Sequence, residues 1–199
     1  MHQAFILISG LVLGIWVYLV LLHGRYWREK PQAAPVAELK HWPEIAAIVP
    51  ARNEAPVIGE ALGSLLRQDY PGKLRIIVID DQSTDGTADM AQRAAADRNA
   101  EDRLRVISGA KLPQGWTGKM WAVHQGMAEL EQFSPGAKYV WLTDADIAHD
   151  RDSLKGLVAR AENGNLALVS LMARLKTDTL AERALIPAYV YFFQMLYPF

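Results

Sequence analysis

The 199-residue sequence contains no cysteine, which excludes disulfide bonds, thiolate metal sites and cysteine nucleophiles. Any bound metal must therefore use oxygen or imidazole ligands. The net charge is only −1, so the overall charge lacks the excess of Lys and Arg that nucleic-acid binding requires, and we expect no nucleic-acid partner. Hydrophobic residues make up 51% and charged residues 22%, a balance that argues against disorder and allows one domain plus an appendage.

Two common nucleotide-binding motifs are also missing from the sequence. No G-x-G-x-x-G occurs, so a dinucleotide-binding site has little support. The turn from Gly115 to Lys119 is not a P-loop, because the glycine spacing differs and Met120 stands where that motif needs Ser or Thr.

Charge is absent from the stretch between Ala4 and Leu22, which is almost entirely apolar. A helix of about 20 apolar residues spans the hydrocarbon core of a bilayer. A cleaved signal peptide is the alternative, but it would need a basic start and a shorter apolar run. We therefore expect a retained transmembrane anchor.

Basic residues follow this apolar run and none precedes it. They are Arg25, Arg28 and Lys30. Positive charge is enriched on the cytoplasmic side of membrane spans, so we expect the carboxyl-terminal part of the chain to lie in the cytoplasm. The prolines from Pro31 to Pro43 indicate a short extended linker.

After Pro43, short apolar runs alternate with helical patterns, which is typical of an α/β fold with a mostly parallel sheet flanked by helices. The predicted strands are Ile45–Val49, Leu74–Ile79, Leu104–Ile107, Tyr139–Thr143 and Leu166–Leu171. The predicted helices are Pro56–Arg67, Thr87–Ala96 and Met120–Leu130. Such sheets bind ligands beyond the carboxyl ends of their strands, where this sequence has PARNE, DDQSTDGT and DAD.

The PARNE segment, residues 50–54, joins the first strand to a helix. By itself it favours a structural interpretation, in which Asn53 caps the helix. The DDQSTDGT segment begins with two adjacent carboxylates, Asp80 and Asp81. Successive strand residues face opposite sides, so only one of them can face a given ligand. We assign Asp85 and Gly86 to the turn and the helix cap.

The DAD segment places Asp144 and Asp146 after the fourth strand. Carboxylates two residues apart share a face of a strand or converge in a turn, and their oxygens suit Mg²⁺ or Mn²⁺. Lys119, at a predicted helix start, is suited to a phosphate, because free amides and the helix dipole add positive potential there. His124 and His149 are more often structural than ligating in such positions, and His149 is the better candidate.

Together, PARNE, DDQSTDGT, GWTGKMWA and DAD resemble the family 2 glycosyltransferases of the GT-A fold, over about Glu44 to Leu171. The combination is far more specific than any single motif. GWTGKMWA and the apolar amino terminus are most similar to the hopene-associated glycosyltransferases of bacterial hopanoid synthesis.

The resemblance implies a nucleotide-sugar donor, with a UDP-sugar favoured, and a lipid acceptor, for which a hopanoid is the specific candidate. Pro50, Arg52 and Glu54 would line the nucleoside pocket, and Asp81 would bind the edge of the base.

The resemblance also implies a diphosphate and metal region. Lys119 would lie near the diphosphate, and Asp144 would contact the ribose or the metal. Asp146 would coordinate the Mg²⁺ or Mn²⁺ that bridges the diphosphate. The site would face the cytoplasm at a bacterial inner membrane.

The implied reaction is direct, inverting displacement at the anomeric carbon, assisted by the cation. The catalytic base is unknown, because the acidic residue and the Gln-x-x-Arg-Trp element expected downstream are not visible. We therefore expect a partial protein without its acceptor region. Two alternatives remain open: a nucleotidyltransferase-like metal-nucleotide enzyme, and a donor-binding fragment without turnover.

We expect four regions along the chain. These are an anchor at 1–24, a linker at 25–43, a nucleotide-sugar-binding domain at 44–175 and an apolar segment at 176–199. The aromatic residues of the last segment suit either a membrane interface or packing against further chain.

Overall fold

The structure, a computed structural model, describes residues 2–23, 39–175 and 177–197. The chain forms two compact units. One is Val36–Leu171, and the other combines Met1–Pro35 with Met172–Phe199.

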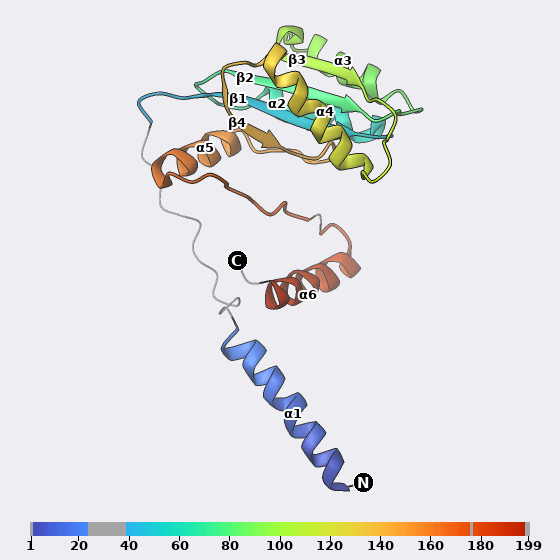
Figure 1. The fold of residues 1–199 in the computed structure, drawn as a ribbon, viewed down its shortest axis with the longest axis vertical. Coiled ribbons are helices and arrows are strands. Elements are labelled where there is room, and N and C mark those ends of the chain that lie inside the picture. Colours follow the sequence, from blue (N-terminus) through green and yellow to red (C-terminus); the bar gives the residue numbers. More distant parts are fainter. Residues whose placement is uncertain (1, 24–38, 176, 198–199) are drawn as a thin grey trace. The chain divides into compact units, whose positions relative to one another are not determined.

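A four-stranded parallel sheet forms the centre of the first unit (Figure 1). Its strands are β1 (Glu44–Ala51), β2 (Leu74–Asp80), β3 (Leu104–Ser108) and β4 (Ala137–Leu142). The spatial order is β3-β2-β1-β4, with every neighbouring pair parallel. The predicted α/β class and the first four predicted strands are confirmed.

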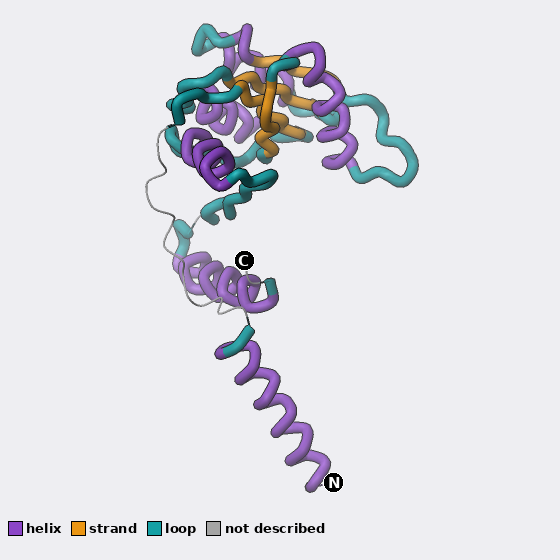
Figure 2. The backbone as a smooth tube through the Cα atoms, turned by 60° about the vertical axis from the view of Figure 1, so that its left-hand side comes forward, coloured by secondary structure: helices purple, strands orange, loops and turns teal. Residues whose placement is uncertain are grey.

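Helices cover both faces of the sheet (Figure 2). They are α2 (Ala55–Leu66), α3 (Thr87–Ala96), α4 (Gly118–Phe133) and α5 (Ser153–Gly164), with a short 3₁₀ helix at Glu101–Arg103. Alternate residues of β2 point to opposite faces: Ile76 packs in the core with α2, α3 and α5, whereas Ile77 packs with α4. The central strands are therefore mostly apolar, as expected for strands covered on both sides, and their charged residues lie at or next to the strand ends.

The predicted strand Leu166–Leu171 is wrong, because no strand forms there in the described part of the chain. These residues follow α5, whose C-cap residue, Asn165, has a left-handed conformation with φ 48°. Leu168 is 82% exposed. An apolar run specifies a strand only when a neighbouring strand pairs with it, and the run itself carries no information about that partner.

Helix α5 was missed by the sequence analysis, although its core face has a helical pattern. Leu154, Val158 and Ala161 are buried at a spacing of four and then three residues. That spacing is the signal that would have located the helix.

The second unit contains α1 (His2–Leu21) and α6 (Leu180–Leu196). With a mean hydropathy of 2.5, α1 is long and apolar enough to cross a membrane, a criterion that signal sequences also meet. A capping box formed by Thr179 and Glu182 starts α6, which continues through Pro187. The basic residues predicted to orient the anchor and most of the predicted linker lie outside the described residues.

Candidate functional site

A cleft of about 340 Å³ opens where the carboxyl ends of β1, β2 and β4 meet the start of α4. Its lining contains every site residue named from the sequence: Pro50, Arg52, Glu54, Asp81, Lys119, Asp144 and Asp146. The remaining lining residues, which the sequence analysis did not name, are Ala51, Gly118, Ala122 and Ala145. All but Ala122 sit beside a named residue in the chain, and their small side chains leave the cleft open.

An ion pair joins the β1 and β2 walls of the cleft. Arg52 Nη1 donates to Asp81 Oδ2 at 3.3 Å, and the Asp81 side chain is only 10% exposed. Asp80 does not line the cleft, and its Oδ1 accepts from the Ser83 amide at 3.2 Å. A Cβ added at Gly118 would lie 3.1 Å from Asp81 Oδ2, so a glycine there lets α4 begin close to this carboxylate.

A second ion pair joins β4 to α4. Lys119 Nζ lies 2.5 Å from Asp144 Oδ1. β4 ends at Leu142, and Ala145 is buried while Asp146 is exposed. The two carboxylates are therefore carried by the turn after the strand, one of the two arrangements considered from the sequence.

A divalent cation would find only carboxylate oxygens here. No group of three or more His, Asp or Glu side chains in the described residues forms a metal site. However, Mg²⁺ commonly binds through one or two carboxylates and completes its coordination with substrate phosphates and water. Asp144 and Asp146 fit that kind of site, in which a substrate phosphate and water would supply the remaining ligands.

The starts of α2 and α4 differ in whether side chains cap their free backbone amides. Asp85 Oδ2 accepts from the Ala55 amide at 3.0 Å, and Thr87 Oγ1 accepts from the Glu54 amide at 2.9 Å, so the β2–α3 loop and the first residue of α3 cap α2. At α4, within the described residues, the Thr117 side chain makes no capping bond. The positive end of α4 therefore remains available to an anion in the cleft.

The β2–α3 loop has the structural role expected for Asp85 and Gly86. Gly86 has φ 88°, a left-handed conformation that glycine adopts without strain. Hydrogen bonds to Asp85, chiefly from the Thr87 hydroxyl, hold the pKa of this carboxyl below its ordinary value.

The predicted helix cap at Asn53 is wrong. The residue preceding α2 is Glu54, without a side-chain cap, whereas Asn53 has φ 55° and its Oδ1 accepts from the Thr84 amide at 2.9 Å. Asn tolerates left-handed backbone, and here it ties the PARNE turn to the β2–α3 loop.

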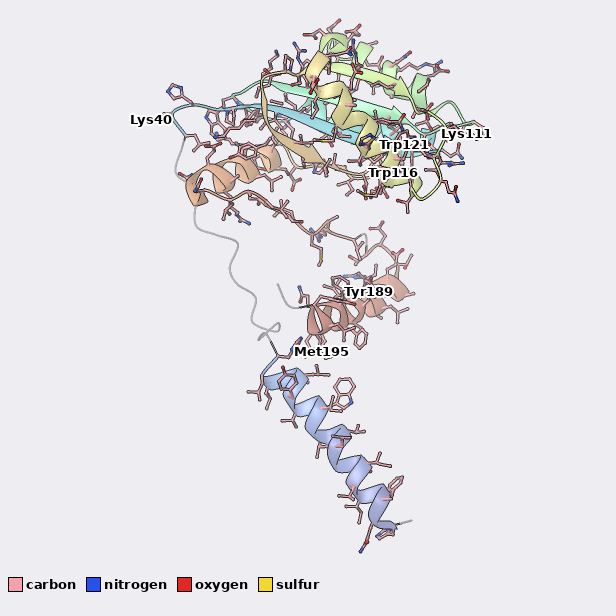
Figure 3. The ribbon with its side chains drawn as sticks, viewed as in Figure 1. Lys40, Lys111, Trp116, Trp121, Tyr189 and Met195 are labelled. Atoms are coloured by element: carbon pink, nitrogen blue, oxygen red, sulfur yellow. The ribbon has the colours of Figure 1, made fainter. Side chains whose placement is uncertain are left out.

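The two histidines considered from the sequence do not line the cleft. His124 stacks on Trp121, which lies beside Trp116 near the start of α4 (Figure 3). His149 is half-buried with its ring 4.5 Å from that of Trp141, and burial lowers the pKa of its imidazole despite the opposing charge of Asp150.

Comparison with known proteins gives a family match and similar bacterial sequences. The family described as glycosyl transferase family 2 matches residues 46–198. An N-acetylglucosaminyltransferase of Bradyrhizobium elkanii is 40% identical over 140 residues, covering 69% of this chain and 71% of that protein. One of Rhizobium leguminosarum bv. viciae is 43% identical over 76 residues, covering 38% of this chain and 18% of that protein.

A solved structure with a similar fold is the mannosyltransferase of Pyrobaculum calidifontis in complex with GDP-Man and Mn²⁺. It superposes with a TM-score of 0.58 and 28% identity, over 78% of this chain and 42% of that chain. This chain thus spans less than half of that structure and about a fifth of the Rhizobium leguminosarum relative.

Proposed function

Because the chain belongs to glycosyl transferase family 2, we propose that it is the donor-binding part of an inverting glycosyltransferase that uses a UDP-sugar and a divalent cation. The observation that carries this proposal is the single cleft in which all seven predicted residues meet. Each of its two ion pairs sets a carboxylate beside a basic side chain. The carboxylates can therefore accept from the polar edge of a base, and the basic side chains can bind an anion.

The nucleoside occupies the part of the cleft between β1 and β2. Asp81 accepts from the N–H of the base, and Arg52 orients this carboxylate by donating to its Oδ2. Pro50 and Glu54 line the same wall. The low exposure of Asp81 strengthens this hydrogen bond, because water competes less with the base for a shielded carboxylate.

The diphosphate lies between α4 and the turn after β4 that carries Asp144 and Asp146, which we call the carboxylate turn. Lys119 and the amides at the start of α4 donate to its oxygens. Asp144 and Asp146 are the residues that would hold the cation. When bound, Mg²⁺ or Mn²⁺ supplies positive charge that stabilises the departing nucleoside diphosphate.

The names of the similar proteins guide the choice of donor. Bacterial relatives are N-acetylglucosaminyltransferases, which supports a UDP-sugar carrying N-acetylglucosamine as the first donor to test. The archaeal structure contains GDP-Man and Mn²⁺, so a GDP-sugar is the necessary comparison.

The acceptor in this proposal is a lipid, and a hopanoid is the specific candidate because of the GWTGKMWA segment at residues 115–122. The apolar helix α1 supports a site held beside a bilayer. We propose that α1 anchors the protein in a bacterial inner membrane with the cleft on the cytoplasmic side, as the basic residues after α1 favour.

The proposal is tested by titrating UDP and GDP into the full, detergent-purified chain in a calorimeter, with and without Mn²⁺. Circular dichroism establishes first that the chain is folded. We expect UDP to bind in the presence of Mn²⁺ and more weakly in its absence. A folded chain that binds neither nucleotide with Mn²⁺ would contradict the proposal.

Substitution of Lys119 by Met should weaken UDP binding about tenfold and leave uridine binding unchanged, because only UDP carries the diphosphate. The factor corresponds to roughly 1.4 kcal/mol, near the low end for a charged hydrogen bond. Lys111→Met is the matched control, since Lys111 is exposed in the β3–α4 loop and does not line the cleft (Figure 3). Equal losses for UDP and uridine would place Lys119 elsewhere than at the diphosphate.

A further inference from the structure

The carboxylate turn is held from behind by a residue outside the cleft. Thr143, which directly precedes Asp144, is buried, and its Oγ1 is hydrogen-bonded to His149 Nε2 at 2.8 Å. This bond closes the loop of residues 143–149 upon itself. The turn that carries Asp144 and Asp146 lies inside the closed loop.

The far end of that loop is tied to α2. The His149 amide donates to Ser64 Oγ at 2.9 Å, and the Ser64 hydroxyl donates in turn to the Ala61 carbonyl at 2.7 Å. Ser64 is itself buried. Its hydroxyl therefore joins the helix backbone to the loop without contact with solvent, where hydrogen bonds are strong and costly to lose.

Three further hydrogen bonds attach the residues after this loop, up to the start of α5, to the segment that directly follows α2. Gln68 Nε2 donates to the Asp150 carbonyl at 2.7 Å, and Gln68 Oε1 accepts from the Leu154 amide at 2.9 Å. The Asp69 amide donates to the Arg151 carbonyl at 2.7 Å. We call the side chains of Ser64, Gln68, Thr143 and His149 the α2 clasp.

Helix α2 connects two walls of the cleft through this clasp. Its first turn follows Glu54, which lines the cleft beside Arg52, and its last turn carries Ser64. A helix of 12 residues is about 18 Å long and rigid compared with a loop. The β1 wall and the carboxylate turn are therefore fixed to the same element at opposite ends.

We propose that the residues of the α2 clasp are positioning residues, which hold Asp144 and Asp146 in the geometry that binds the cation together with the nucleoside diphosphate. The inference rests on the proposed function of the cleft. The backbone of an unrestrained turn can adopt many conformations, and only some of them place both carboxylates where they can bind one cation. The clasp restricts the turn before the ligand arrives.

The first variant is His149→Ala, for which we expect the affinity for UDP in the presence of Mn²⁺ to fall about tenfold, as for partners that orient metal ligands. UDP binding without Mn²⁺ should stay unchanged, because Arg52 and Asp81 do not touch the clasp. If His149 only stabilised the fold, the substitution would lower the affinity for UDP equally with and without Mn²⁺.

The second variant, Thr143→Val, keeps the side-chain shape and removes the hydroxyl. It tests the same hydrogen bond with the packing preserved, in case His149→Ala does not fold. It should reproduce the loss, and Thr143→Ser, which restores the hydroxyl, should recover affinity. His41→Ala is the control, because His41 is exposed and lies outside the clasp.

All variants are compared by calorimetric titration of UDP with and without Mn²⁺, after circular dichroism has shown that they are folded. Folded His149→Ala and Thr143→Val chains with wild-type affinity in Mn²⁺ would overturn the role of the clasp. A wild-type chain that shows no Mn²⁺-dependent nucleotide binding would instead overturn the proposed function, and the clasp proposal with it.

Discussion

Asp146→Ala is expected to abolish the enhancement of UDP binding by Mn²⁺, with a loss of affinity of about 100-fold or more in the presence of the metal. Groups that merely orient metal ligands change metal affinity about 10- to 100-fold, so loss of a ligand should have at least that effect. Asp146 is exposed in the turn after β4, and its removal should change the free energy of unfolding by less than about 0.5 kcal/mol. Calorimetric titration of UDP with and without Mn²⁺ measures the effect.

Asp144→Ala should also weaken UDP binding in the presence of Mn²⁺, but this substitution has two effects at once. Removal of this carboxylate also frees Lys119, which then faces the diphosphate without a partner carboxylate. Both side chains are about half exposed, so the ion pair itself contributes little to stability. Asp146 is therefore the cleaner test of the metal assignment.

The control for Asp146→Ala is Asp150→Ala. Asp150 is exposed in the same connection between β4 and α5, carries the same charge and does not line the cleft. We expect near-wild-type binding from this variant. If folded Asp146→Ala bound UDP equally well with and without Mn²⁺ and as tightly as the wild-type chain in Mn²⁺, Asp146 would not be a metal ligand.

Gly126→Ala should lower the free energy of unfolding by about 1–2 kcal/mol. A Cβ at this position of α4 would lie 2.6 Å from Ile48 Cγ2. Ile48 is fully buried in β1 and cannot move aside. Overpacking of this kind costs about 1–3 kcal/mol, and the higher helix propensity of alanine offsets up to about 1 kcal/mol of it. Chemical denaturation followed by circular dichroism measures the difference.

Gly156→Ala provides a control of opposite sign. Gly156 lies inside α5, and a Cβ there would have no atom within 4 Å. We expect this substitution to raise the free energy of unfolding by about 0.5–1 kcal/mol through helix propensity alone. Destabilisation by both substitutions, or stabilisation by both, would mean that contact with Ile48 does not set the position of α4.

The strands and the ligand edge could be predicted because their signals are local. The run Leu74–Ile79 is apolar except for Arg75, and polar residues follow it immediately, which marks both a strand covered on two faces and its ligand end. Parallel strands end at a shared edge, so PARNE, DDQSTDGT and DAD had to be neighbours. The partners of individual side chains were not predictable: Asn53, expected as a helix cap, bonds to the β2–α3 loop instead.

By itself, the sequence determined the α/β class, the apolar amino-terminal helix and the set of polar residues at one edge of the sheet, because each depends on spacing along the chain. Only the tertiary structure decided that Arg52 pairs with Asp81, that Lys119 pairs with Asp144, and that Leu166–Leu171 forms no strand. These outcomes depend on which segments pack together in space. The clasp is of the same kind, because Ser64 and His149 meet across 85 positions of sequence.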